Sequence, residues 1–262
     1  MANFAFNNSP AFNGKSVAPA IPTPAELDEQ FGLPSPTNDQ LDRMSYEDTI
    51  AKTAAGFAVL VAGAAIGWFF SFLLIPAAIV GFVLALVNTF KKQPSPALVL
   101  AYAAVEGVFV GGISAVYASM WDGIVPMAVF GTLGVVAVTL ALFASGKVRA
   151  SKRATKIFLV AMVGYLAFSL VNLGLMVFGV TDSMFGLRDA TIMGIPLGVI
   201  LGIVVVLLAA YSLVLDFDMV KRGVETGQPR IYGWTAAFGI IVTVVWLYVE
   251  ILRLLTYLMP RN

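Results

Sequence analysis

The feature that most constrains the fold is the segment Thr53–Phe90, a run of 38 residues without a charged side chain. At about 1.5 Å per residue, one helix of this length would extend for about 57 Å. The hydrocarbon core of a bilayer is only about 30 Å thick. Because Ser71–Pro76 interrupts the run, we expect two membrane spans, Ile50–Phe70 and Leu73–Phe90, with Pro76 in the first turn of the second.

The composition extends this expectation to the whole chain. Hydrophobic residues make up 59% and charged residues 12% of the sequence, and the mean hydropathy is +0.89. An ordinary soluble domain has about 25% charged residues, so the chain is expected to be an integral membrane protein whose first partner is the lipid bilayer. A net charge of +1 offers no basic surface for nucleic acid, and no nucleic-acid partner is expected.

The sequence contains no cysteine and no histidine. Disulfides, thiolate nucleophiles, Cys/His zinc sites and imidazole bases are therefore excluded, and no cofactor is expected. An intramembrane enzyme is not expected either, because a serine nucleophile would have no histidine base and aspartyl proteolysis needs two facing aspartates. Proton chemistry would have to fall mainly to carboxylates.

Five further spans follow the first two, which predicts an all-α bundle of seven transmembrane helices. They are expected at Ala97–Met120, Ile124–Ala144, from the basic run Lys147–Lys156 to about Val180, Thr191–Asp216 and Trp234–Leu258. Residues 1–48 are rich in Asn, Pro, Ser and Ala and lack a signal-peptide pattern. We predict a disordered polar cytoplasmic tail, either passive or a docking segment, followed by a transmembrane domain at 49–262.

The distribution of basic residues predicts the orientation, because cytoplasmic loops retain Lys and Arg. With the N-terminus inside, thirteen of the sixteen basic residues lie on the cytoplasmic side, and Arg188, Arg253 and Arg261 remain outside. The sequence therefore predicts a multi-pass protein of the cytoplasmic (inner) membrane with its C-terminus outside.

Small residues recur at helical spacing in three spans. They are Gly63 and Gly67, Gly107 and Gly111, and Gly194, Gly198 and Gly202. Such faces allow helix backbones to approach closely in lipid. Packing within one chain is the expected use and a dimer interface is the alternative, so the oligomeric state remains open.

Four acidic residues lie within or at the end of predicted spans, where each costs roughly 2.5 to 3.5 kcal/mol at a helix centre. Glu106, near the middle of the third span, is either a neutral acid bonded to a neighbouring helix or part of an ion or proton path. Asp216 and Asp218 are two residues apart and so point about 200° apart on a helix. We expect Asp216 to face the bundle and Asp218 to face Lys221 or Arg222.

Glu250 is the fourth of these acids, and two arrangements are open for it. It can pair with Arg253, three residues later in the same helix, or with Asp216 across helices. Two carboxylates held close together would share a proton, which would provide a pH switch without histidine. When both are ionised they would attract a hard cation, and calcium is the possible ligand or permeant ion.

These residues resemble the Bax inhibitor-1 (transmembrane Bax-inhibitor motif) family, especially its longer bacterial members, over about Met44–Leu258. The similar segments are Glu106–Gly111, Leu215–Asp216 followed by Lys221–Thr226, and Leu247–Ile251. The resemblance implies seven helices with the seventh at the centre. It also implies a carboxylate pair, at the positions of Asp216 and Glu250, that acts as a pH-sensitive latch on a calcium leak.

The chain departs from the family pattern in three ways. Glu250 stands where many relatives carry Asp, and the second span has no basic residue before Lys91 that could join the latch. Third, 34 positions separate Asp216 from Glu250, more than expected for the family, and the two are level only if the connecting turn centres on Gly233. A turn at Gly227–Pro229 would place Glu250 roughly 12 to 18 Å too deep.

The leading functional hypothesis is a pH-sensitive calcium leak through Asp216 and Glu250. The alternative is a non-conducting interaction protein that modulates a membrane protease or docks on a larger membrane complex. Its expected contact regions are the N-terminal tail and the basic run Lys147–Lys156.

Overall fold

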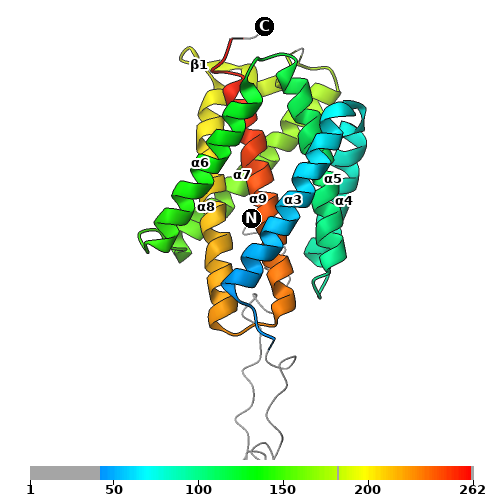
Figure 1. Cartoon of the computed structure of the whole chain (residues 1–262). Helices are drawn as coiled ribbons and strands as arrows, with labels where there is room; N and C mark the ends of the chain where they lie inside the picture. Colours follow the sequence, from blue (N-terminus) through cyan, green and yellow to red (C-terminus); the bar gives the residue numbers. More distant parts are fainter. Residues whose placement is uncertain (1–41, 182, 261–262) are drawn as a thin grey trace, which may run out of the picture.

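The computed structural model describes residues 42–181 and 183–260. Within this part of the chain, seven helices are long and apolar enough to cross a membrane, as the sequence predicts. They are α3 (Tyr46–Phe69), α4 (Leu74–Phe90, preceded by the 3₁₀ turn Ser71–Leu73), α5 (Pro96–Ala118), α6 (Ile124–Ala144), α7 (Lys152–Val177), α8 (Leu197–Glu225) and α9 (Gly233–Leu255). With this odd number of crossings, the start of α3 and the end of α9 lie at opposite ends of the bundle (Figure 1). The expectation of an all-α, seven-helix membrane bundle is confirmed.

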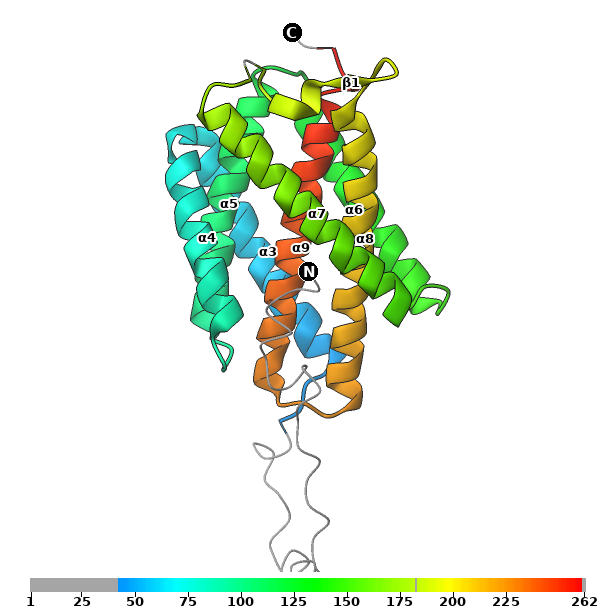
Figure 2. The ribbon, with the colours of Figure 1, turned by 180° about the vertical axis from the view of Figure 1, so that it is seen from behind.

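Helix α9 forms the centre of the bundle. It is the most buried of the seven spans and packs against α3, α5, α6 and α8. Figures 1 and 2 show it enclosed from both sides by the other helices. The prediction of a central seventh helix is therefore confirmed, and side chains on α9 can reach several neighbours.

The closest helix pair is α3 with α5, which cross through the predicted glycine faces. A Cβ added at Gly63 would collide with the carbonyl oxygen of Ala104, and one added at Gly111 would collide with that of Ala64. These glycines thus serve packing within the chain, because no side chain fits between the two backbones.

Helix α7 packs least tightly, with Phe158 and Asn172 as its buried residues. Figure 2 shows it crossing obliquely over α9. Helix α7 also begins earlier than its apolar stretch, at Lys152. Ser151 caps this end, since its hydroxyl accepts a hydrogen bond from the Ala154 amide at 3.2 Å.

The predicted start of the sixth span at Thr191 is wrong. A two-residue hairpin comes first, in which β1 (Thr191–Ile192) pairs with β2 (Ile195–Pro196), and α8 begins at Leu197. Gly194 has a φ of +83° in the hairpin turn, so it does not belong to the helical glycine face. Helix α8 then continues past Asp216 to Glu225, well beyond the predicted end.

The residues before α3 lie beneath the turn between α8 and α9. The Met44 amide donates to the Gln228 carbonyl at 2.6 Å, and the Arg230 amide donates to the Asp42 carbonyl at 3.0 Å. Ser45 caps α3 by accepting a hydrogen bond from the Asp48 amide at 3.1 Å. Helix α3 therefore begins inside the predicted tail, most of which lies outside the described residues.

Candidate functional site

Asp216 lies inside the bundle on α8 and has no exposed surface. The Thr243 hydroxyl, on α9, donates a hydrogen bond to its Oδ2 at 2.6 Å. The sequence prediction that Asp216 faces the interior agrees with this position. A polar contact therefore joins α8 and α9 inside the bundle.

The expected interhelical pair of Asp216 with Glu250 does not form in this structure. Helix α8 ends at Glu225 and α9 begins at Gly233, so the connecting turn centres near residue 229. This turn brings Thr243 level with Asp216. Glu250 lies seven residues further along α9, which is about 10 Å of axial rise. The expectation of a level pair fails because the turn centres near residue 229, four residues before Gly233.

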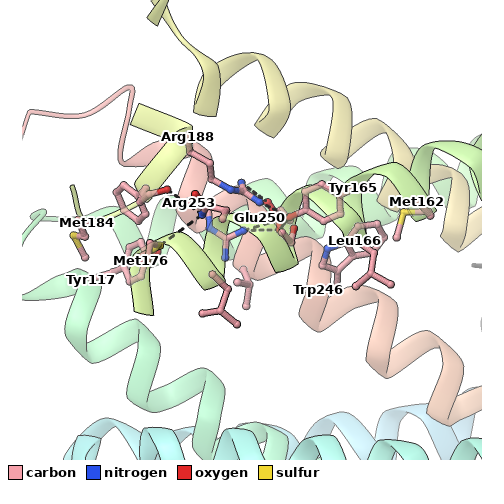
Figure 3. A pocket seen from close by; sticks show the side chains of 15 residues that line it. Tyr117, Met162, Tyr165, Leu166, Met176, Met184, Arg188, Trp246, Glu250 and Arg253 are labelled. Carbon is pink, nitrogen blue, oxygen red and sulfur yellow. Dashed lines mark hydrogen bonds and ion pairs between the residues drawn. The ribbon is translucent and has the colours of Figure 1, made fainter. Parts of the chain in front are cut away.

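Glu250 instead belongs to a cluster of two arginines and a tyrosine, and it is only 2% exposed. Arg253 Nη1 donates to its Oε1 at 2.6 Å, and the Tyr165 hydroxyl donates to the same oxygen. Arg188 Nη1 lies 3.5 Å from Oε2. Figure 3 shows these side chains converging on Glu250. The intrahelical pair with Arg253, one of the two open arrangements, is therefore present.

Arg188 enters this cluster from the loop before α8 and is 5% exposed. Its Nη2 donates to the Tyr165 hydroxyl at 2.6 Å, and its guanidinium lies 5.4 Å from the centre of the Tyr165 ring and 6.0 Å from that of Phe168. Asn172 anchors the loop by accepting from the Leu187 amide at 2.6 Å. These contacts hold a buried cation against Glu250 through hydrogen bonding and cation–π attraction.

Sequence reasoning missed Arg188 and Tyr165 as site residues. One signal for Arg188 was available, because it is among the few basic residues on the side opposite the basic loops. Arg261, another of these, lies outside the described residues. No spacing rule connects Tyr165 with Glu250, since the two are 85 positions apart.

A tightly packed apolar layer separates the two carboxylates along the bundle. Leu213 is one turn above Asp216 on α8, and Leu247 is one turn below Glu250 on α9; neither has exposed surface. Beside this layer, the Tyr248 hydroxyl and Ser114 Oγ are hydrogen-bonded at 2.6 Å. In this conformation the two acids are therefore separate sites.

Asp218 and Glu106, the other predicted site residues, lie elsewhere. Arg222 Nε donates to Asp218 Oδ2 at 2.8 Å, while Lys221 pairs with Glu225 at 3.5 Å. Glu106 is half-buried at the interface of α5 and α4, where its Oε2 would lie 2.8 Å from a Cβ placed on Gly81. Neither acid joins the Asp216 or the Glu250 cluster.

Among the described residues, no three Asp, Glu, His or Cys side chains come together as a metal site. Calcium takes six to eight oxygen ligands in proteins. Because Asp216 and Glu250 lie at different depths, they do not offer a joint coordination site in this conformation.

The seven apolar helices of the described residues, with α9 at their centre, define the class of protein, a polytopic α-helical membrane protein. A family model described as Bax inhibitor 1 like matches residues 4–260 of the sequence. The chain belongs to this family. A search of curated proteins gave no match.

Proposed function

We propose that the protein is a pH-sensitive calcium leak of the cytoplasmic membrane, with its N-terminus inside, and that the described conformation is closed. The observation that carries this proposal is the burial of two carboxylates on the adjacent helices α8 and α9, with Asp216 at 0% and Glu250 at 2% exposure. Acidic groups in the interior of a membrane bundle are costly and typically mark ion or proton paths.

In the proposed mechanism, each carboxylate holds the central helix at one depth. Glu250 attaches α9 to α7 through Tyr165 and to the loop before α8 through Arg188. Asp216 attaches α8 to α9 through Thr243. The leucines between the two sites close the path to ions.

Protonation would open this path, because a neutral carboxyl group attracts a guanidinium less and accepts hydrogen bonds more weakly. Release of α9 would then open the leucine layer between the two acids. Asp216, ionised while Glu250 is protonated, would give calcium a weak site along the open path, which suits conduction because a tightly bound ion would leave slowly. No catalytic role is part of this proposal.

Calcium efflux from proteoliposomes at several pH values tests the proposal. Asp216→Asn and Glu250→Gln should each change the pH dependence of efflux, while Asp218→Asn, which removes a peripheral acid, should leave it as in the wild type. The variant that flattens the pH profile identifies the titrating group. An unchanged rate and profile in both site variants would refute the leak mechanism.

The second candidate is the non-conducting interaction protein. It is favoured by one observation: the five basic residues between α6 and the second turn of α7 are all exposed. They are Lys147, Arg149, Lys152, Arg153 and Lys156. Such a patch suits an acidic surface on a membrane protease or larger complex.

Deletion of residues 1–41 tests whether the tail contributes to such docking. The deletion should end before Asp42, because residues 42–45 bond to the α8–α9 turn and Ser45 caps α3. Loss of a co-purifying partner with efflux intact would assign docking to the tail. A partner bound by the full chain, with no calcium efflux at any pH, would favour the interaction role over the leak.

A further inference from the structure

A cavity of about 610 Å³ lies beside Glu250, between the outer half of α9 and the obliquely crossing α7. Its walls are mainly apolar, aromatic and sulfur-containing, and its polar end holds the arginine cluster. The lining includes Leu166, Ser169, Leu173, Arg188, Trp246 and Glu250 (Figure 3).

The cavity opens sideways toward the lipid. Leu166 and Leu173 line it, yet they are also 42% and 57% exposed on the outside of α7. Since both side chains face the hydrocarbon region, a molecule in the bilayer can reach the cavity between helices without passing through water. The methionines in the wall are flexible and adapt to chains of different shape.

The polar end of the cavity carries an excess of one positive charge, from Arg188 and Arg253 against Glu250. Asp189, next to this end, is bonded elsewhere: it accepts from the Tyr257 hydroxyl at 2.8 Å and from the Phe185 amide at 3.3 Å. Neither oxygen of Asp189 is among the groups that line the cavity. An additional anion would therefore balance the charge of the lining.

Three buried polar atoms of this lining have no hydrogen-bond partner within residues 42–181 and 183–260: Arg188 Nη1, Ser169 Oγ and Glu250 Oε2. Arg188 Nη1 and Glu250 Oε2 face each other as an ion pair at 3.5 Å. A buried donor without a hydrogen bond costs about 1 to 3 kcal/mol. An acceptor group in the cavity would satisfy the two donors, Arg188 Nη1 and Ser169 Oγ.

We propose that this cavity binds a membrane amphiphile by its anionic head, a carboxylate or a phosphate. Arg188 and Ser169 donate to the head, and the chain lies along Leu166 and Leu173 toward the bilayer. A guanidinium forms paired hydrogen bonds to carboxylate or phosphate oxygens, which matches this head chemistry. The volume lies within the range of about 300 to 1,000 Å³ that is usual for small-molecule sites.

The fluorescence of Trp246, which lines the cavity, provides the test. The full chain in neutral detergent is titrated with a long-chain fatty acid brominated on its chain, and with brominated phosphatidylglycerol. The matched neutral probes are the brominated fatty alcohol and brominated phosphatidylcholine. We expect saturable quenching by an anionic probe at a concentration at least tenfold below that of its neutral counterpart, and loss of the saturable component in Trp246→Phe.

Two variants probe the polar end. Arg188→Gln should weaken anionic binding at least tenfold, while Arg153→Gln, an exposed arginine at the other end of α7, should not. Ser169→Leu fills the cavity without changing its charge and should weaken binding as well. If Arg188→Gln does not fold, Ser169→Leu decides the matter.

The two brominated anions also distinguish the source of the head group. Quenching by the fatty acid alone indicates a free carboxylate, and quenching by phosphatidylglycerol alone indicates a lipid phosphate. Equal quenching by charged and neutral probes, saturable quenching that persists in Trp246→Phe, or wild-type binding in folded Ser169→Leu would overturn the proposal. Competition by inorganic phosphate alone, without any amphiphile effect, would also overturn it. The assay contains no calcium gradient, so its result is independent of the leak.

Discussion

Glu250→Gln should destabilise the protein far more than Asp218→Asn, although both changes neutralise an acid that is paired with arginine. The side chains of Glu250 and Arg188 are 3% and 6% exposed, whereas Arg222, the partner of Asp218, is 63% exposed. Removing one partner of a buried ion pair costs about 3 to 5 kcal/mol, because the other charge stays buried. An exposed pair contributes about 1 kcal/mol or less.

For Glu250→Gln we expect the lower end of this range, about 3 kcal/mol. Glutamine keeps the volume and can still accept from Tyr165, and Arg253 is partly exposed, so its charge is less costly to leave unpaired. The free energy of unfolding would be measured in mixed micelles by titration with a denaturing detergent, with helix content as the signal.

A double-variant cycle strengthens this comparison. Adding Arg188→Gln to Glu250→Gln removes the buried cation that the first change leaves behind, so part of the lost free energy should return. The reasoning would be refuted if Glu250→Gln cost no more stability than Asp218→Asn. It would also be refuted if the double variant lost the full sum of the free energies lost by Glu250→Gln and Arg188→Gln alone.

Two further predictions concern helix packing and Asp216. Gly111→Ala should cost about 1 to 3 kcal/mol of stability, because the added Cβ meets the Ala64 carbonyl oxygen. The control is Gly134→Ala, where nothing lies within 4 Å of the added Cβ. This variant should be neutral or stabilising in the same unfolding titration. Thr243→Val keeps the side-chain shape but removes a hydrogen bond to Asp216, so it should lower stability by about 1 to 3 kcal/mol. The same variant should raise calcium efflux at neutral pH; an efflux rate equal to that of the wild type would contradict the role assigned to this bond.

Much of the fold was accessible from the sequence because membrane spans follow from length and hydropathy. The helix ends were not, since helices continue beyond their apolar segments. In α8 the pairs Asp218–Arg222 and Lys221–Glu225, each four residues apart, extend the helix from the apolar segment into polar surroundings. The extension moves the turn toward Gly233, but the turn still centres near residue 229, so Glu250 lies deeper than Asp216.

The candidate site was only partly predictable, for a different reason. The sequence identifies Asp216 and Glu250 as acids that need partners, but it does not identify Thr243 or Tyr165 as those partners. Which side chains meet depends on the axial offset between two helices. Each residue added to or removed from a helix end changes this offset by about 1.5 Å. Arg188 reaches Glu250 from a loop whose path has no periodic pattern.

The pH dependence of calcium efflux in wild-type and Glu250→Gln proteoliposomes measures whether Glu250 holds the leak closed. If Glu250 holds the closed conformation through Arg188 and Arg253, the wild type should leak more as the pH falls. Glu250→Gln should leak at neutral pH and respond less to acid. A wild-type protein that conducts no calcium at any pH, or a Glu250→Gln profile identical to that of the wild type, would contradict the account.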